Sequence, residues 1–339
     1  MKTVLLTGAG GYIGSVLAKM LLEAGYAVRA LDRYFFGPTL ERLRPNPALK
    51  LIKADVRDFD PRLMEGVWAV VDLAALSNDP AGELDPKVTL AINHQGRARV
   101  ARLAKEYGAE RYVLASSCSV YGFQEGLLDE TSPTNPLTTY AEANLKAEQS
   151  NLPLADECFC VTALRQATVY GLSPRMRFDL AINGMTLGLW RDGKIPLLRD
   201  GSQWRPFVHV RDTSRAFLAV LQAPKELVNG QVFNVGADEQ NYQILPLAQQ
   251  IAQALGKPFV FEWYGLSDHR SYRVSFAKIK KTLGFAPQFT PADAAREIAA
   301  ALEAGRVVPD DRTITLKWYK NLLEWHRLIR EVELDGRIL

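Results

Sequence analysis

The stretch that decides the fold is residues 1–32, MKTVLLTGAGGYIGSVLAKMLLEAGYAVRALD. An apolar run at 4–6 is short enough for a buried strand, and a second one at 27–31 ends on Asp32. Between them lies a helical apolar pattern that Gly25 stops, preceded by three regularly spaced glycines, Gly8, Gly11 and Gly14. Strand, glycine turn, helix, strand and acid is the order that a dinucleotide-binding unit requires.

Each part of this unit has a physical task. Glycines let the backbone turn tightly and approach a pyrophosphate, and a helix that starts near Tyr12 directs its free N–H groups and positive dipole end at the phosphates. Asp32 would accept hydrogen bonds from the adenosine ribose hydroxyls and repel a 2′-phosphate, which favours NAD over NADP; the adjacent Arg33 weakens this preference. The glycine spacing differs from G-x-G-x-x-G, and the alternative is a tight turn in another α/β protein.

The composition is that of an ordinary globular protein. The chain has 339 residues, of which 47% are hydrophobic and 23% are charged, with a formal net charge of +3. This balance gives no electrostatic case for a nucleic acid or a membrane surface, and no apolar run reaches membrane-spanning length. We expect a cytoplasmic, reduced protein without a structural metal, because Cys158 and Cys160 resemble core packing more than a metal site.

Strands and helices alternate after Asp32. Strands are expected at 49–53, 68–73, 111–115 and 159–165, with helices at 85–107 and 141–152. This rhythm predicts an α/β fold, a Rossmann-type doubly wound parallel sheet. It is lost from Ser173 onward. We therefore predict an NAD-binding domain of 1–172 plus about 207–238, and a smaller, interleaved C-terminal substrate lobe of about 173–206 plus 239–339.

Several motifs occur together in a characteristic order. They are TGAGGYIG, Asp32, ADVRD, LAA, Asn93, SSCSVYG, YAEANLKAE, LRQATVYG and RPFVHVRD, and they span roughly four-fifths of the chain. In these motifs the chain resembles the extended short-chain dehydrogenase/reductase family, in its nucleotide-sugar epimerase and dehydratase branch. The resemblance implies a tightly held NAD that oxidises a sugar hydroxyl, usually at C4, a nucleotide-diphosphate sugar as substrate, and a homodimer formed through the helices at 85–107 and 141–152.

Residues at the carboxyl ends of the predicted strands are expected to hold the cofactor, because ligands of doubly wound sheets bind there. Asp55 can reach an adenine amino group, and the small residues after the fourth strand let backbone lie against the cofactor. The predicted cofactor-binding residues are Gly8, Gly11, Tyr12, Ile13, Gly14, Asp32, Arg33, Asp55, Val56, Leu73, Ala74, Ala75, Asn93, Ser116, Tyr140 and Thr168.

The resemblance places the catalytic tyrosine at Tyr140 and its serine partner at Ser117. The family motif is Tyr-x-x-x-Lys, but the residue four positions after Tyr140 is Asn144. Lys146 lies about 240° around the helix from Tyr140 and cannot substitute. A charge about 5 Å away is worth roughly 3 kcal/mol at an effective dielectric near 20, or about two pKa units.

Three interpretations of Asn144 follow. The chain is a slow enzyme, an enzyme with altered chemistry, or a protein that binds cofactor and sugar without turnover. On the sequence alone, replacing Asn144 with lysine is expected to raise turnover at neutral pH.

Two further features bear on the substrate. Dehydratases of the family carry an Asp-Glu pair where this chain has Cys118 and Ser119, so epimerisation or reduction of a keto-sugar fits better than dehydration. The resemblance makes Arg205 and Arg270 the candidates for clamping a diphosphate, with Asn183 a weaker one; solvated surface charges are the alternative. The aromatic residues Trp318, Tyr319 and Trp325, at helical spacing, are expected to serve core or lobe packing.

Overall fold

A parallel sheet of seven strands forms the centre of the molecule. The computed structural model describes residues 1–265 and 271–338. The sheet has the order β11-β7-β5-β4-β1-β2-β3, and every neighbouring pair is parallel. Its strands are β1 (Thr3–Thr7), β2 (Ala27–Asp32), β3 (Leu49–Lys53), β4 (Ala69–Asp72), β5 (Arg111–Ser117), β7 (Cys160–Gln166) and β11 (Gln231–Val235).

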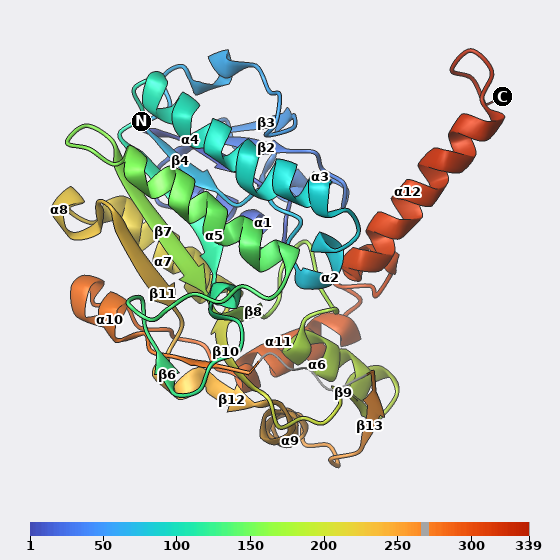
Figure 1. Cartoon of the computed structure of the whole chain (residues 1–339). Coiled ribbons are helices and arrows are strands. Elements are labelled where there is room, and N and C mark those ends of the chain that lie inside the picture. The colour runs from blue at the N-terminus through green and yellow to red at the C-terminus, as the bar shows by residue number, and fades with distance from the viewer. Residues whose placement is uncertain (266–270, 339) are drawn as a thin grey trace.

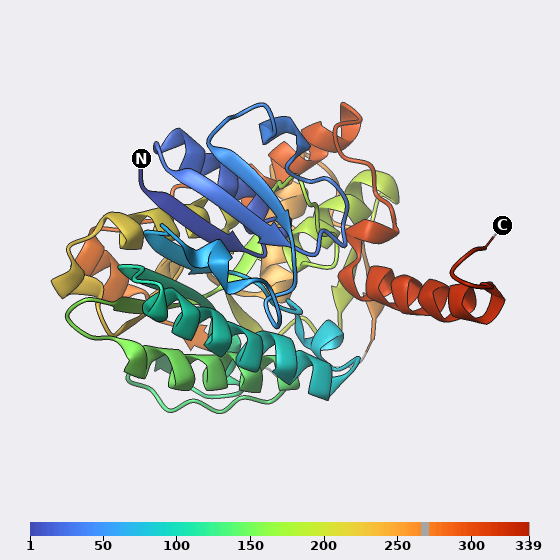
Figure 2. The ribbon, with the colours of Figure 1, turned by 90° about the horizontal axis from the view of Figure 1, so that it is seen from above.

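Helices cover both faces of this sheet (Figures 1 and 2). Helices α1 (Gly14–Glu23) and α7 (Val210–Gln222) pack against each other on one face. Helices α4 (Arg97–Glu106) and α5 (Thr139–Asn151) pack side by side on the other. Each face buries its own apolar cluster. The predicted doubly wound α/β fold is therefore confirmed.

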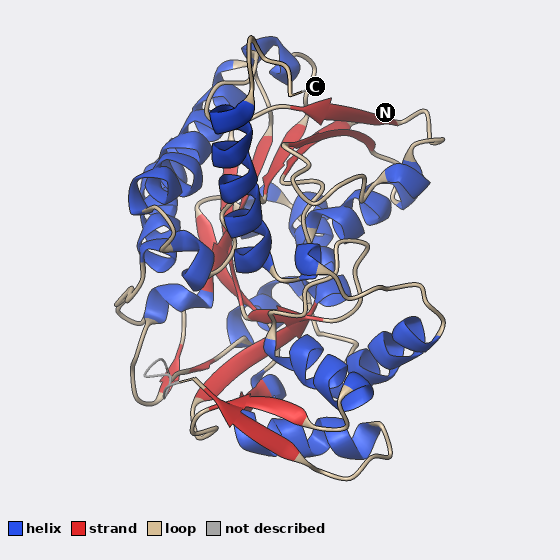
Figure 3. Cartoon of the chain, turned by 90° about the vertical axis from the view of Figure 1, so that its right-hand side faces the viewer, coloured by secondary structure: helices blue, strands red, loops and turns tan. Residues whose placement is uncertain are grey.

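A second group of elements surrounds another apolar cluster (Figure 3). It contains β8 (Thr168–Tyr170), β10 (Trp204–His209) and β12 (Asn241–Gln243) in one small sheet, and β9 (Ile195–Leu198) paired with β13 (Phe261–Tyr264). Helices α6 (Ala181–Arg191), α9 (Ile244–Ala254) and α11 (Pro291–Glu303) pack together beside them. The remaining elements are β6 (Leu127–Leu128), paired with β14 (Arg273–Val274), and the helices α8 (Lys225–Val228) and α10 (Ala277–Leu283). The division into two domains at the stated boundaries stays a prediction.

Three local expectations are corrected. The helix predicted over 85–107 is divided into α3 (Pro86–Leu90), a π-helical turn at 91–96 and α4, and the short helix α2 (Asp79–Gly82) precedes it. Helix α12 (Thr315–Val332) projects from the body, so that Trp325 is 45% exposed, although its ring packs edge-on against Trp318 (Figure 1). Cys158 is exposed because β7 begins only at Cys160. Within the described residues, no helix combines the length and apolar character needed to cross a membrane.

The turn after β1 depends on close backbone packing. Gly8 has a φ of +65°, and a Cβ on it would lie 2.8 Å from the carbonyl carbon of Leu73 in the loop after β4. A Cβ on Gly14 would lie 2.2 Å from the carbonyl oxygen of Gly8. The register pairs Thr7 of β1 with Leu31 and Asp72 of the two flanking strands, so all three strands end at the same edge.

This packing predicts that Gly14→Ala is more harmful than an ordinary glycine replacement. The methyl group would press on rigid backbone, and we expect a loss of more than about 2 kcal/mol in the free energy of unfolding. Gly66→Ala is the control, because Gly66 has a φ of +67° but a Cβ added there would meet no atom within 4 Å, and its cost is about 1 kcal/mol from backbone strain alone. Equal losses in urea unfolding would contradict the packing argument.

Candidate active site

A cleft of about 690 Å³ opens at the carboxyl edge of the sheet, between the sheet and the second group of elements. Its size is that of a small-molecule site. The structure brings most of the predicted site residues to its walls, and those that line it are Gly8, Gly11, Tyr12, Ile13, Gly14, Asp32, Arg33, Asp55, Val56, Leu73, Ala74, Ala75, Ser116, Ser117, Tyr140, Asn144, Thr168 and Arg205.

Asp32 is held in a fixed orientation at the end of β2. Its carboxylate accepts hydrogen bonds from the backbone N–H of Gly10 at 2.9 Å and of Tyr34 at 2.6 Å. Burial raises the pKa of this carboxyl group, while the two backbone hydrogen bonds oppose the rise. The side chain therefore stands at the place where the glycine turn and the second strand meet, as the dinucleotide-binding pattern requires.

The positive charge of Arg33 is paired with Asp55. Its guanidinium donates to the Asp55 carboxylate at 2.7 Å, and Arg57 donates to the same group at 2.7 Å. These hydrogen bonds hold the pKa of Asp55 well below its usual range. Because Arg33 is already paired with a carboxylate, it opposes the Asp32 charge less than its sequence position suggests.

Aromatic residues close the same end of the cleft. Phe35, Phe36 and Tyr319 line it, and the indole N–H of Trp318 in α12 donates to the carbonyl of Phe35 at 2.7 Å. Arg175 lies over the Phe36 ring, 3.7 Å from its centre. Tyr319 was expected only to pack against the core or the lobe. It also lines the cleft, because the first turns of α12 bring its ring to the cleft wall.

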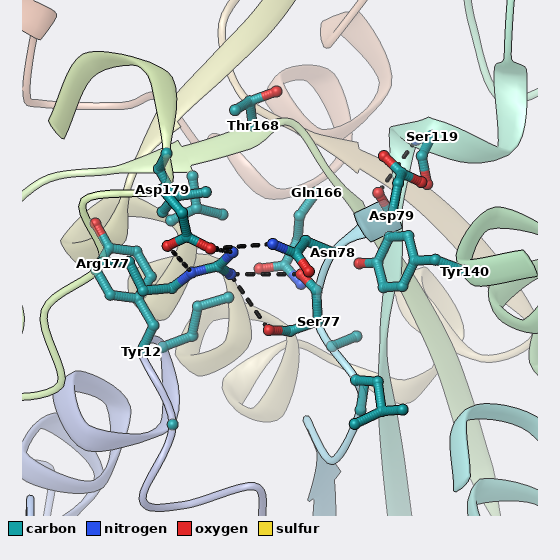
Figure 4. A pocket seen from close by; sticks show the side chains of 18 of the residues that line it. Tyr12, Ser77, Asn78, Asp79, Ser119, Tyr140, Gln166, Thr168, Arg177 and Asp179 are labelled. Carbon is teal, nitrogen blue, oxygen red and sulfur yellow. Dashed lines mark hydrogen bonds and ion pairs between the residues drawn. The ribbon is translucent and has the colours of Figure 1, made fainter. Parts of the chain in front are cut away.

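Tyr140 occupies the opposite end of the cleft, in the first turn of α5. Thr138 caps this helix by accepting from the backbone N–H of Ala141, and its hydroxyl donates to Asp79 at 2.5 Å. The Tyr140 ring projects into the cleft beside Asp79 (Figure 4). Burial, and next the negative charge of Asp79, raise the pKa of the Tyr140 phenol. Hydrogen bonding by Ser117 and the charge of Arg97 act in the opposite direction.

Asn144 is buried and its amide is bonded within the protein. Its Nδ2 donates to the carbonyl of Tyr140 at 3.0 Å, and its Oδ1 accepts from Nη1 of Arg97 at 3.0 Å. Lys146 lies on the outer side of the helix, where it pairs with Glu142 at 2.6 Å. The geometry therefore agrees with the inference that Lys146 cannot take the place of a lysine at position 144.

Polar residues that the sequence did not single out form a network in the middle of the cleft (Figure 4). The guanidinium of Arg177 donates to Asp179 at 2.8 Å and contacts Ser77, while Asn78 donates to Asp179 at 3.0 Å. Asp79 completes the set that sequence reasoning missed. The sequence shows that the segment after β8 contains arginines such as Arg177. It does not show that this segment folds back over the loop after β4, and that contact arranges the network.

Two predicted residues, Asn93 and Asn183, are not brought into the cleft. Asn93 is buried behind its wall, where its amide both accepts from and donates to the backbone of Leu76. Asn183 accepts from Gly171 N–H and donates to the hydroxyl of Tyr12 at 3.0 Å. Both amides thus shape the wall rather than line it. Arg270 lies outside the described residues.

Comparison with known proteins identifies the family. The model of the NAD dependent epimerase/dehydratase family matches residues 4–236. The chain belongs to this family. The resemblance inferred from the sequence motifs is confirmed, and the cofactor of the family is NAD, as the glycine turn and Asp32 predict.

The chain is similar over most of its length to relatives of differing activity. It is 31% identical to a UDP-glucose 4-epimerase of Mycolicibacterium smegmatis, covering 86% of this chain and 96% of that one. It is 30% identical to a dTDP-glucose 4,6-dehydratase of Streptomyces griseus, with coverages of 86% and 90%. Among solved structures, MoeE5 in complex with UDP-glucuronic acid and NAD superposes with a TM-score of 0.79 at 27% identity, covering 89% of this chain and 99% of that one.

The residues present fit a dinucleotide. The turn at 8–14 forms a cradle that a Cβ on Gly8 or Gly14 would fill. Within the described residues, the buried Nε and Nη1 of Arg175 have no hydrogen-bond partner, and this side chain lines the same end of the cleft. Buried donors of this kind cost free energy unless a ligand accepts from them.

The geometry at Asp32 predicts its effect on cofactor choice. Asp32→Asn removes the charge that repels a 2′-phosphate and weakens the acceptor of the ribose hydroxyls. We expect the Kd for NAD to rise about tenfold to a hundredfold and the preference over NADP to shrink. Calorimetric titration with both nucleotides measures this, with the exposed Asp58→Asn as the control. An unchanged preference in Asp32→Asn would contradict the assignment.

Proposed function

We propose that the chain is an NAD-dependent nucleotide-sugar epimerase that works at sugar C4, with Tyr140 as acid and base. The observation that carries the proposal is the position of the phenol. Tyr140 and Ser117 reach the cleft from different elements, α5 and the end of β5, at the end of the cleft opposite Asp32. A sugar placed between them and the glycine turn would meet a phenol on one side and the cofactor on the other.

The protein's own part in this reaction is to hold the sugar and move one proton. When bound, NAD would accept a hydride from the carbinol carbon and return it, while the glycine turn, Asp32 and Asp55 hold the nucleotide. Tyr140 takes the proton from the C4 hydroxyl and later gives it back, and Ser117 bonds the same oxygen. Return of the hydride to the opposite face of the sugar ketone would invert C4.

The residues after Ser117 support epimerisation over dehydration. Cys118 is buried, and its Sγ is directed at the carbonyl of Arg165 at 3.3 Å, away from the cleft. Burial raises the pKa of this thiol, so it is a poor proton donor or acceptor. Ser119 lines the cleft but carries no carboxyl group. The two positions that hold an acid pair in dehydratases therefore supply no acid or base here.

We propose a nucleoside-diphosphate sugar as the substrate. Solved relatives were crystallised with UDP-glucuronic acid and UDP-glucose. In this chain Arg205 lines the cleft at β10, with its guanidinium over the ring of Tyr272. A guanidinium held over an aromatic ring is a suitable partner for a diphosphate.

Replacing the phenol tests the proposal. With NAD present, the wild-type chain is expected to equilibrate a pair of C4-epimeric UDP-sugars without net formation of NADH. Tyr140→Phe is expected to lower kcat about 100-fold to 10,000-fold and to change the Kd for NAD far less. Tyr107→Phe, at the far end of α4, is the control and should keep full activity. Chromatography of the sugar nucleotides gives the rates.

Other outcomes point to other functions. Consumption of added NADH or NADPH with a keto-sugar would make the chain a reductase. A thermal shift caused by nucleotide-sugars without turnover would make it a binding protein, one of the three interpretations of Asn144. Either result would replace the epimerase proposal.

We also infer a homodimer formed through α4 and α5, which lie side by side on one face of the sheet (Figure 1). The inference follows from the family resemblance. Light scattering of the purified chain should give twice the mass of 37.8 kDa, and a monomer at micromolar concentration would contradict it.

A further inference from the structure

A buried arginine, Arg97, packs beneath helix α5, which carries Tyr140. Arg97 begins α4 and is 1% exposed. Its Nη1 donates to the side chain of Asn144 at 3.0 Å, and its Nη2 donates to the carbonyls of Asp72, at 3.2 Å, and Ala115. One guanidinium thus connects the ends of β4 and β5 to α5, one helical turn from Tyr140.

The counter-charge of Arg97 lies on the side away from Asn144. Nε of Arg97 is 4.0 Å from the carboxylate of Asp72, which also accepts the hydroxyls of Thr7 at 2.5 Å and Tyr112 at 2.6 Å. All of these side chains are buried. The two hydroxyls partly satisfy the negative charge, so the guanidinium presents its positive side to Asn144 and α5.

We propose that Arg97 replaces, through Asn144, the lysine of the Tyr-x-x-x-Lys motif: it supplies the fixed positive charge next to Tyr140 and orients the helix that carries the phenol. The proposal deepens the proposed function, since it concerns the same site. Arg97 acts as a positioning residue, because Asn144 stands between it and the cleft. The amide of Asn144 links the two residues, because its Oδ1 accepts from Arg97 and its Nδ2 donates to the carbonyl of Tyr140.

Among the described residues, the other charged side chains around Tyr140 are either negative or paired with a carboxylate, so Arg97 is the one that we assign as the source of the positive charge. Asp79, from α2, is negative and raises the pKa of the phenol, whereas Arg97 lowers it. Arg177, from the segment after β8, is paired with Asp179. On α5 itself, Glu148 is paired with Arg165 and Lys146 with Glu142.

The contact reverses the expectation for position 144. Asn144→Lys would place an ammonium where Arg97 now donates a hydrogen bond, and two like charges in a buried site repel. We therefore expect Asn144→Lys alone to lower both the melting temperature and the turnover. The same substitution should be tolerated once Arg97 is replaced by a neutral side chain.

The test uses Arg97→Met, Asn144→Lys and the double variant, with Arg111→Met as a matched control. Arg111 is also buried, and its guanidinium donates to two backbone carbonyls, of Val220 and Ala223, at the opposite end of β5. Ionisation of Tyr140 is measured as the ultraviolet absorbance difference between each protein and its Tyr140→Phe counterpart. The pH profile of kcat is the second readout.

We expect Arg97→Met to raise the pKa of Tyr140 by about one unit, half of the effect of an ammonium in direct contact, because Asn144 separates the charges. The acidic limb of the kcat profile should move upward equally, so that turnover falls about tenfold at pH 7 and recovers at high pH. The double variant should regain the wild-type titration, and Arg111→Met should leave it unchanged.

An unchanged Tyr140 titration in folded Arg97→Met would overturn the proposal and make Arg97 purely structural. If Arg97→Met does not fold, Arg97→Lys and Arg97→Gln decide: the lysine variant must keep the wild-type titration and the glutamine variant must raise it. A wild-type chain inactive on every nucleotide-sugar would count against the proposed function, whereas the absorbance titration would still decide the role of Arg97.

Discussion

The site depends on the contact between the turn after β1 and the loop after β4. Gly8 meets the backbone of Leu73 and Ala74, and Gly14 folds back over the carbonyl of Gly8. No side chain fits between these segments, so the ends of the strands stand at one edge of the sheet. This close packing sets the position of the strand-end residues that line the cleft, and the point at which α1 begins.

The opposite end of the cleft depends on how charge is distributed around a buried phenol. Burial and the nearby Asp79 raise the pKa of Tyr140, whereas Ser117 and Arg97 act to lower it. The Tyr-x-x-x-Lys motif would supply a positive charge from a lysine on the tyrosine's own helix. Here the positive charge comes from a neighbouring helix and is anchored by Asp72. A departure from the motif thus need not remove the charge, since a different element supplies it.

Local patterns predicted the framework and both ends of the cleft. The glycine turn, Asp32 and the alternation of strands and helices depend on neighbours in sequence, and the family resemblance pointed to Tyr140. Arg97 escaped prediction because nothing in the sequence distinguishes it from Arg99 and Arg102 on the same helix; only the packing of α4 against α5 buries it. Asn183 was predicted to bind substrate because the sequence does not show its partners. Its amide is already bonded to Gly171 and Tyr12, which the fold brings beside it.

The decisive measurement is a crystal structure of the chain with NAD and a UDP-sugar. We expect the pyrophosphate over the turn at 8–14, the adenosine ribose on Asp32, and the hydroxyl of Tyr140 within hydrogen-bond distance of the sugar C4 oxygen, with the contact between Arg97 and Asn144 retained. A nucleotide bound elsewhere, or a Tyr140 hydroxyl turned away from the sugar, would contradict it.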